Sequence, residues 1–210
     1  MTAESIIFDM DGTLWDSSRS VAQSWNEAVA GLPDVNINLT EKDIQGIMGL
    51  TMDVIADKFF GNTSKERRME IMDICGSHEN EYLKIHGGKL YENVERTLDL
   101  LSREHRLFIV SNCQSGYIEA FLEYYNLGKQ FDGFVCWGDN NLSKGDNIKY
   151  IMNKNNITDA VYVGDTQGDC DSAYYAGAKF IHAAYGFGTA DRADAVIHRF
   201  DELSSLFGSC

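Results

Sequence analysis

Residues 6–16 read IIFDMDGTLWD, and this stretch decides the fold that the chain is expected to adopt. Three apolar residues, enough for a short buried strand, run directly into two carboxylates. Because side chains two apart on an extended chain share a face, Asp9 and Asp11 should project toward one spot beyond the strand. Gly12 lets the chain turn there and lets a ligand approach the backbone. The alternative interpretation is a solvated Asp-x-Asp turn.

Two carboxylates placed in this way favour a cation between them. Asp9 and Asp11 would repel each other unless a cation or a proton lay in between. Mg²⁺ is a hard cation that prefers carboxylate oxygens as ligands. The stretch therefore predicts a magnesium site beyond the end of the first strand.

Residues 160–171, AVYVGDTQGDCD, form a second apolar run that ends in carboxylates. Gly164 closes the run, and Asp165 and Asp169 follow it. If a helix begins at Thr166 or Gln167, Asp169 lies on its first turn, can face back toward Asp165, and is favoured there by the helix amides. Ligands of open α/β sheets bind beyond the carboxyl ends of the strands. The two acidic strand ends therefore belong to one site if their strands are neighbours.

Two further segments carry polar groups suited to a phosphate. The apolar run at residues 107–110 leads into Ser111 and Asn112, a hydroxyl and an amide that can hold phosphate oxygens. A polar loop is expected at residues 138–145, and it carries Lys144. Lysine on a loop is usually solvated, but a phosphate close to several carboxylates needs a positive point charge.

In this order the four segments resemble the motifs of the haloacid dehalogenase superfamily of phosphohydrolases, of the phosphoglycolate phosphatase-like type with a helical cap. The first and fourth motifs read Asp-x-Asp-Gly-Thr-x-x-Asp and Gly-Asp-x-x-x-Asp, and the second and third supply a hydroxyl and a lysine. Gly145 follows Lys144 where close members of the family have proline. The residues that match are Asp9, Asp11, Gly12, Thr13, Asp16, Ser111, Lys144, Gly164, Asp165 and Asp169.

The resemblance implies an α/β fold, with a doubly wound, Rossmann-like parallel sheet as its core and a small helical cap domain inserted into it. Helical spacing of apolar residues between Asp16 and His86, without a strand-like run, agrees with an inserted cap. Thr40, Thr51 and Ser64 are expected to cap helices in this segment. We therefore expect a catalytic core at residues 1–15 and 86–210 and a cap at residues 16–85.

The resemblance also implies roles for the matched residues. Asp9 would be the nucleophile and form an aspartyl-phosphate. Asp11 would be the acid for the leaving group and then the base for the attacking water. Mg²⁺ would be held by the side chains of Asp9 and Asp165 and by the main-chain carbonyl of Asp11, with Asp169 supporting the site. The groups that would bind the phosphoryl oxygens are the side chains of Ser111, Asn112 and Lys144 and the main-chain amides of Asp11 and Gly12.

The predicted activity is a Mg²⁺-dependent phosphatase that acts on a small phosphorylated metabolite. Thr13 favours this over the related phosphosugar mutases, which often have an apolar residue at that position. Asp11 separates the chain from the dehalogenases proper, which lack this carboxylate. The remaining alternatives are a mutase, a phosphorylation-receiving signalling domain, which is about half this length, and a catalytically silent binding protein.

The substrate itself is not predicted, and candidates include phosphoglycolate, sugar phosphates, nucleotides and pyrophosphate. Residues 48–51 are similar to the specificity loop of related phosphatases, and they contain no cation that could hold a second anionic group. Lys42, Arg67 and Arg68 lie near in sequence, but basic residues on helices are usually solvated.

Composition limits the classes of binding partner and the cellular location that are expected for this chain. The 210 residues carry a net charge of −14, which argues against nucleic acid and anionic membranes as partners. No apolar run approaches the length of a membrane span. The absence of a leader segment and of a regular cysteine pattern favours a reduced cytoplasm. We expect a monomer or a homodimer. The five cysteines are Cys75, Cys113, Cys136, Cys170 and Cys210.

Overall fold

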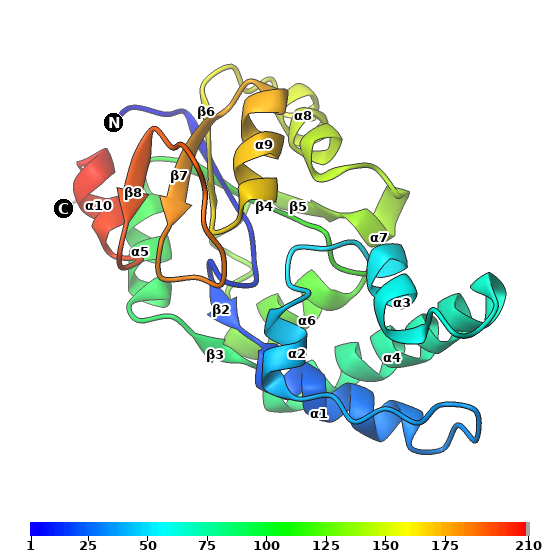
Figure 1. Cartoon of the computed structure of the whole chain (residues 1–210). Coiled ribbons are helices and arrows are strands. Elements are labelled where there is room, and N and C mark those ends of the chain that lie inside the picture. The colour runs from blue at the N-terminus through cyan, green and yellow to red at the C-terminus, as the bar shows by residue number, and fades with distance from the viewer. Residues whose placement is uncertain (209–210) are drawn as a thin grey trace.

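The computed structural model describes residues 1–208, and its centre is a parallel sheet of six strands in the order β5-β4-β1-β6-β7-β8 (Figure 1). The first strand lies in the middle, and later strands are added on one side and then on the other. This is the doubly wound, Rossmann-like arrangement predicted from the sequence. The strands are β1 Ser5–Phe8, β4 Arg106–Ser111, β5 Gly133–Cys136, β6 Ala160–Gly164, β7 Lys179–Ala183 and β8 Ala195–Ile197.

The register of the central strands brings their carboxyl ends to one edge. Strand β1 pairs with β4 on one side and with β6 on the other, so that Phe8 lies opposite both Ile109 and Val163. All four residues of β1 are buried, because helices cover both faces of the sheet. The residues that follow β1 and β6 therefore emerge side by side.

Alternate side chains of each strand point to opposite faces, and each face has its own apolar layer. Ile6 and Phe8 pack with α5, α6 and α10, whereas Ile7 packs with α8 and α9. These helices are α5 Val94–Leu101, α6 Tyr117–Tyr125, α8 Lys144–Lys154, α9 Gln167–Ala176 and α10 Glu202–Phe207. A one-turn helix, α7 Trp137–Asn140, follows β5.

Four helices between β1 and β4 pack around an apolar cluster of their own, which includes Trp25, Ile44, Ile55 and Ile71. They are α1 Ser18–Val29, α2 Glu41–Gln45, α3 Met52–Phe60 and α4 Lys65–His86, and they lie together beyond one edge of the sheet (Figure 1). The helical character predicted for this segment is confirmed. The boundaries at residues 15/16 and 85/86 stay a prediction.

Two of the three helix caps predicted for this segment form the expected side-chain hydrogen bond. Thr40 and Ser64 each accept a hydrogen bond from an amide of the first turn, as predicted. Thr51 occupies the cap position of α3, but it accepts no amide hydrogen bond, and its hydroxyl donates to the carboxylate of Asp53 at 2.5 Å. Thr51 therefore stands at the predicted start of the helix, but without the capping hydrogen bond.

A small antiparallel pair of strands was missed by the sequence analysis. Strand β2 (Trp15–Asp16) pairs with β3 (Lys89–Leu90), and this pair ties together the two connections that lead into and out of the helical segment. Two residues are too few to show the alternation that identifies a strand in sequence. Trp15 is fully buried there, against Tyr117, Phe121 and Tyr125.

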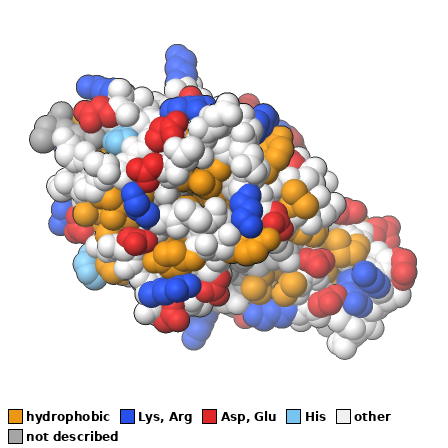
Figure 2. Space-filling model, turned by 90° about the horizontal axis from the view of Figure 1, so that it is seen from above, with side chains coloured by type: hydrophobic (Ala, Val, Ile, Leu, Met, Phe, Trp, Pro, Cys, Tyr) orange, Lys and Arg blue, Asp and Glu red, His pale blue; other side chains and the backbone are white. Residues whose placement is uncertain are grey.

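The surface mixes charges of both signs. On the face drawn in Figure 2, acidic and basic side chains of the described residues are interspersed, and no continuous basic patch covers it. Within residues 1–208, no helix has both the length and the apolar character needed to cross a membrane. Four cysteines, at positions 75, 113, 136 and 170, carry free thiols, and Cys210 lies outside the described residues.

Candidate active site

Three neighbouring strands deliver the predicted site residues to one edge of the sheet. Asp9 follows β1, Ser111 ends β4 and Asp165 follows β6. A carboxylate oxygen from each of Asp9, Asp165 and Asp169 lies within 4.8 Å of the others, and all three residues are buried. The two acidic strand ends thus meet in space, as the sequence predicted.

Lys144 reaches into this cluster from α8, which packs beside α9 on the same face of the sheet. Its Nζ donates to Oδ1 of Asp9 at 2.9 Å and to Oδ1 of Asp169 at 2.6 Å, and its side chain is only 4 % exposed. The predicted loop around Lys144 was wrong. Lys144 is the first residue of α8, whose N-cap is Ser143, and the helix fixes the direction of the long side chain.

The charge of Lys144 is secured by its partners. Burial by itself lowers the pKa of the Lys144 ammonium, but the carboxylates of Asp169 and Asp9 outweigh burial and hold this pKa well above its usual range. Burial likewise raises the pKa of Asp169, and Lys144 more than reverses that effect, so that the pKa of Asp169 lies below its usual value. Lys144 and Asp169 therefore form a buried ion pair.

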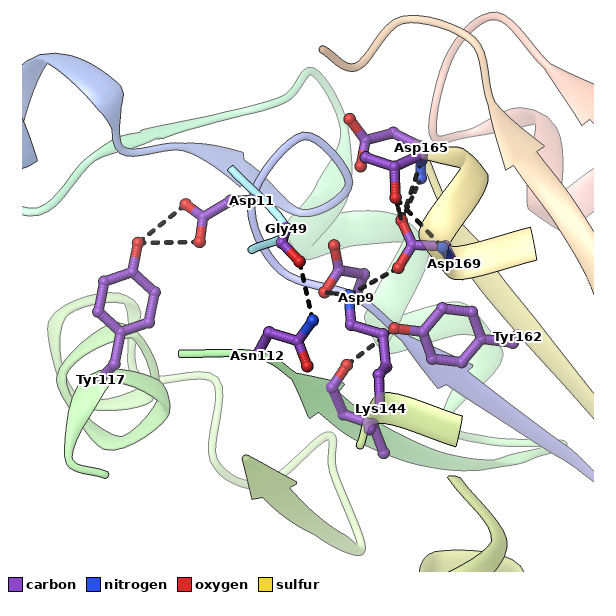
Figure 3. A network of polar contacts seen from close by, with 11 residues as sticks. Asp9, Asp11, Gly49, Asn112, Tyr117, Lys144, Tyr162, Asp165 and Asp169 are labelled. Atoms are coloured by element: carbon purple, nitrogen blue, oxygen red, sulfur yellow. Dashed lines mark hydrogen bonds and ion pairs between the residues drawn. The ribbon is translucent and has the colours of Figure 1, made fainter. Parts of the chain in front are cut away.

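Asp169 is held on the first turn of α9, as predicted from its spacing. Its Oδ2 accepts from the amides of Thr166 at 2.9 Å and Asp165 at 3.2 Å, while the Thr166 side chain accepts from the amide of Asp169. Both oxygens of Asp169 therefore have protein partners. Its geometry is that of an anchor for Lys144 and for the turn after β6 (Figure 3).

Asp165 has one oxygen without a protein partner. Its Oδ2 accepts from the amides of Phe187 at 2.7 Å and Gly188 at 3.3 Å, whereas its buried Oδ1 has no hydrogen-bond partner. Burial and the neighbouring Asp169 raise the pKa of Asp165 to about 7. Burial also raises the pKa of Asp9, and the charges of Asp169 and Asp165 raise it further.

These observations fit a divalent cation. Three buried carboxylates lie close together, but the one ammonium nearby is paired with only Asp9 and Asp169, and a buried charge is stable only if it is paired or bound to a metal. The free Oδ1 of Asp165 offers a ligand atom beside Asp9. A site built only from oxygen ligands suits Mg²⁺ better than a softer metal.

Gly12 is required by the close packing of the site. Its φ of +83° is a conformation that other residues rarely adopt, and a Cβ at this position would lie 2.2 Å from Oδ2 of Asp165. The sequence predicted that Gly12 lets a ligand approach the backbone, whereas the group that approaches it in the structure is the carboxylate of Asp165.

The carboxylate of Asp11 points away from Asp9, toward α6 (Figure 3). The hydroxyl of Tyr117 lies 2.8 Å and 3.0 Å from its two oxygens, and the hydroxyl of Ser17 donates to Oδ1 at 2.5 Å. Burial raises the pKa of Asp11 to about 6, although the hydrogen bonds from Ser17 and Tyr117 oppose this shift. Tyr117 was not predicted as a site residue, because it is 106 residues from Asp11 and belongs to no motif.

Ser111 and Asn112 lie where β4 meets the helical segment. Ser111 is buried, and Nδ2 of Asn112 donates to the carbonyl of Gly49 at 2.8 Å. Gly49 belongs to the 48–51 loop, so this loop contacts the polar edge of the sheet. The Oδ1 of Asn112 is buried and has no hydrogen-bond partner.

A cavity lies between this edge and the helices α1 to α4, and the centre of a water molecule can reach about 50 Å³ of it. One water needs roughly 10–15 Å³ by this measure, so the space suits a small ligand. The polar side chains that line it are Asp9, Asp11, Glu79, Ser111, Asn112, Gln114 and Tyr117. Trp25, Met48, Leu50 and Ile55 are among its apolar walls.

Known proteins resemble this chain over nearly its whole length. Phosphoglycolate phosphatase of Aquifex aeolicus is 28% identical over 194 residues, which cover 87% of this chain and 85% of that protein. A predicted phosphatase from Clostridium acetobutylicum has a solved structure that is 22% identical, covers 98% of both chains and has a TM-score of 0.79. The structure of CbbY from Rhodobacter sphaeroides, in complex with phosphate, has a TM-score of 0.82 at 19% identity and covers 96% of each chain.

The two solved structures are too distant in sequence to show more than the shared fold. The family assignment instead rests on a match along the sequence. A family model described as haloacid dehalogenase-like hydrolase matches residues 6–183, a range that contains every predicted site residue. The chain therefore belongs to the haloacid dehalogenase-like hydrolase family, and its curated relatives indicate a phosphatase of that family.

Proposed function

We propose that the protein hydrolyses a small phosphomonoester through an aspartyl-phosphate formed on Asp9. The observation that carries the proposal is the position of the Asp9 carboxylate, at the end of the central strand, bonded to a buried lysine and close to two further buried carboxylates. A cavity of small size opens directly onto this carboxylate.

Charge explains why the nucleophile needs these neighbours. A carboxylate of charge −1 that approaches a phosphate of about −2 meets a repulsion on the order of 9 kcal/mol at about 3.5 Å, for an effective dielectric constant near 20. Lys144 offsets part of this repulsion from its position beside Asp9. An Oδ of Asp9 would form the new bond to phosphorus while the bond from phosphorus to the leaving oxygen breaks.

Asp11 would manage the proton in both halves of the reaction. In its protonated form it would donate to the leaving alkoxide oxygen, and as a carboxylate it would then take a proton from the water that hydrolyses the aspartyl-phosphate. A pKa near 6 leaves both forms accessible at neutral pH. Tyr117 and Ser17 would position this carboxylate.

The phosphoryl oxygens would be bound by Ser111, Asn112 and Lys144. The Ser111 hydroxyl and the Lys144 ammonium lie at the edge of the sheet that carries Asp9. One N–H of the Asn112 amide is used on Gly49, which leaves the other for a phosphoryl oxygen. This arrangement would position the phosphoryl group and neutralise part of its negative charge, which are the two main requirements of phosphoryl transfer.

Mg²⁺ would be held by the side chains of Asp9 and Asp165 and by the main-chain carbonyl of Asp11, with Asp169 anchoring Lys144 nearby. When bound, the cation supplies positive charge that offsets the repulsion between Asp9 and the phosphate. The free Oδ1 of Asp165 supports its role as a ligand.

Hydrolysis of p-nitrophenyl phosphate should therefore require Mg²⁺. Exhaustive treatment with a chelator should abolish turnover, and added Mg²⁺ should restore it. Because a ligand that binds only the folded state stabilises it, Mg²⁺ at about 100 times its dissociation constant should add about 2.7 kcal/mol to the free energy of unfolding. Enzyme assays and thermal melts with and without Mg²⁺ measure both effects.

The variant Asp165→Asn is the matched test of this site. It should weaken the stabilisation by Mg²⁺ together with the activity, because it removes a ligand charge at almost constant volume. Asp171→Asn, which changes an exposed residue on the same helix, should leave both unchanged. Full activity after complete metal removal would contradict the roles proposed for Asp9 and Asp165.

The variant Tyr117→Phe should lower kcat by about tenfold for an alkyl phosphate, which is part of the roughly 100- to 10,000-fold that a general acid contributes to catalysis. The variant removes the hydroxyl that holds the Asp11 carboxylate, while the ring remains. With p-nitrophenyl phosphate, whose leaving group needs little protonation, phosphoryl transfer to Asp9 should be affected less. Single-turnover kinetics on both substrates distinguishes these effects, and an equal loss with both would indicate a purely structural role for Tyr117.

We propose that residues 16–85 form a cap domain over a core of residues 1–15 and 86–210. Support comes from the separate apolar cluster of α1 to α4 and from the contact between Gly49 and Asn112.

The phosphatase interpretation is favoured over the mutase, the signalling domain and the silent binding protein by the family match and by the named relatives. The expectations of a cytoplasmic location, a monomer or homodimer and no nucleic-acid partner remain predictions.

A further inference from the structure

Glu79 is a buried carboxyl group in the wall of the cavity. It lies on α4, is 3 % exposed, and its Oε2 accepts a hydrogen bond from Nε1 of Trp25. Burial raises the pKa of Glu79 to about 8, although the hydrogen bonds from Trp25 and Gln114 oppose this shift. Glutamate is rarely buried to this degree unless a cation is paired with it, and no basic side chain of residues 1–208 is among its partners.

The basic residues near the cap loop in sequence do not supply this partner. Arg67 is bonded to Asp34 and Glu70, and Arg68 forms an ion pair with Asp57. Lys42 is exposed on α2. Within the part of the chain that the structure describes, no lysine, arginine or histidine lines the cavity. A substrate with a second anionic group would therefore face Asp11 and Glu79 without a counter-charge.

Asn112 offers a second group in the same cavity that lacks its partner. Its Nδ2 is fixed by the carbonyl of Gly49, so its oxygen must be the free acceptor, and this Oδ1 is buried without a hydrogen bond. Phosphoryl oxygens at neutral pH are acceptors and cannot satisfy it. A ligand that carries N–H or O–H donors can, and the cavity wall thus presents carboxylate and carbonyl oxygens beyond the phosphate.

We propose that Glu79 selects phosphomonoesters of small alcohols whose leaving group carries an ammonium group, and that it disfavours leaving groups with a carboxylate. This inference rests on the proposed phosphatase function and adds the substrate class to it. An ammonium supplies the missing positive charge and three N–H donors. The apolar walls, with Trp25 and Ile55 among them, accommodate a short carbon chain.

The negative charge of Glu79 favours an ammonium over a carboxylate at this end of the cavity. Beside a buried carboxylate, where the dielectric constant is lower than in water, opposite charges a few ångströms apart attract more strongly than in water, and like charges repel more strongly. A carboxylate in the place of the ammonium must either lie beside ionised Glu79 or keep Glu79 protonated. The first arrangement brings two like charges together, and the second removes the negative charge that would attract an ammonium, so that phosphoglycolate, the substrate in the names of the relatives, should be a poorer substrate here than the corresponding ammonium compound.

Three alkyl phosphates of equal length test the proposal: 2-aminoethyl phosphate, 2-hydroxyethyl phosphate and 2-phosphoglycolate. They share the phosphoryl group and differ at the far end, which is an ammonium, a hydroxyl and a carboxylate. For the wild-type enzyme with Mg²⁺, kcat/KM should fall in this order, with a ratio of at least about tenfold between the first and the last. In Glu79→Gln this ratio should drop by about tenfold or more.

The variants separate selectivity from structure. Glutamine can still accept the hydrogen bond from Trp25, and thermal melting measures whether the fold is retained. Glu81→Gln removes an exposed carboxylate from the same helix and should leave all three rates unchanged. A merely structural role of Glu79 would lower the three rates equally in Glu79→Gln, and this would overturn the proposal.

Two further outcomes are also decisive. If the wild type prefers 2-phosphoglycolate or 2-hydroxyethyl phosphate, or if it hydrolyses p-nitrophenyl phosphate but none of the three, the proposed selectivity is wrong while the phosphatase function stands. If the enzyme hydrolyses no phosphomonoester at all, p-nitrophenyl phosphate included, the proposed function itself fails. The same set of assays therefore distinguishes a wrong selectivity from a wrong function.

Discussion

Replacing Asp9 with asparagine should reduce phosphatase activity to background, by at least about a thousandfold, which corresponds to about 4 kcal/mol of activation free energy. The amide has nearly the same volume but cannot attack phosphorus as a carboxylate does. Asp9 is the only one of the buried carboxylates that follows the central strand β1 directly and is bonded to Lys144 within residues 1–208. Turnover of p-nitrophenyl phosphate with saturating Mg²⁺ measures the loss.

The same variant should keep or gain stability in the absence of metal. Burial raises the pKa of Asp9, and the charges of Asp169 and Asp165 add to this effect while Lys144 opposes it, so that the ionised form of Asp9 is less favoured in the folded protein than in the unfolded chain. An asparagine removes that disfavoured charge, and its carbonyl can still accept from Lys144. The melting temperature of metal-free Asp9→Asn should therefore equal or exceed that of the wild type.

One result would contradict this assignment, and a second would leave the loss of activity unexplained. More than about a tenth of the wild-type activity, a loss of under 1.4 kcal/mol in barrier, would mean that another residue is the nucleophile. If the variant lost both its activity and its fold, the loss of activity would say nothing about the nucleophile. The melting temperature of the variant shows whether the fold is retained. Asp171→Asn serves as the matched control, because it removes a carboxylate that is exposed on α9.

The sheet and its acidic edge could be predicted because their signals are local. A short apolar run followed by Asp9, and another followed by Asp165, mark two strand ends, and parallel strands deliver their ends to one edge. The spacing of four between Asp165 and Asp169 is set by a helix start, which is also local. Each of these inferences needs only a few neighbouring residues.

The partners of the site could not be predicted, because they come from distant segments. Tyr117 reaches Asp11 from a helix of the other half of the chain, and Glu79 meets Trp25 across 54 residues. In sequence each of these residues is one polar or aromatic position on an amphipathic helix. Only the packing of α1, α4 and α6 brings them to the cavity.

Lys144 was predicted on a loop but begins α8, where it contacts Asp9 and Asp169, and this position defines the last prediction. Lys144→Met should abolish activity and lower the free energy of unfolding by about 3–5 kcal/mol, the usual cost of leaving a buried charge without its partner. The methionine fills the same space, but it leaves Asp9 and Asp169 as two buried carboxylates without an ammonium. Denaturant unfolding and phosphatase assays measure the two losses.

A double variant separates the two roles of Lys144. Lys144→Met combined with Asp169→Asn removes one of the stranded charges, so that much of the lost stability should return, whereas the activity should not. Lys154→Met, on the exposed side of the same helix, should change neither. If activity returned together with stability, Lys144 would serve only to neutralise Asp169. If stability alone returned, the remaining loss of activity would show that Lys144 also binds the phosphoryl group. Within residues 1–208, no other ammonium is bonded to Asp9 or lines the cavity.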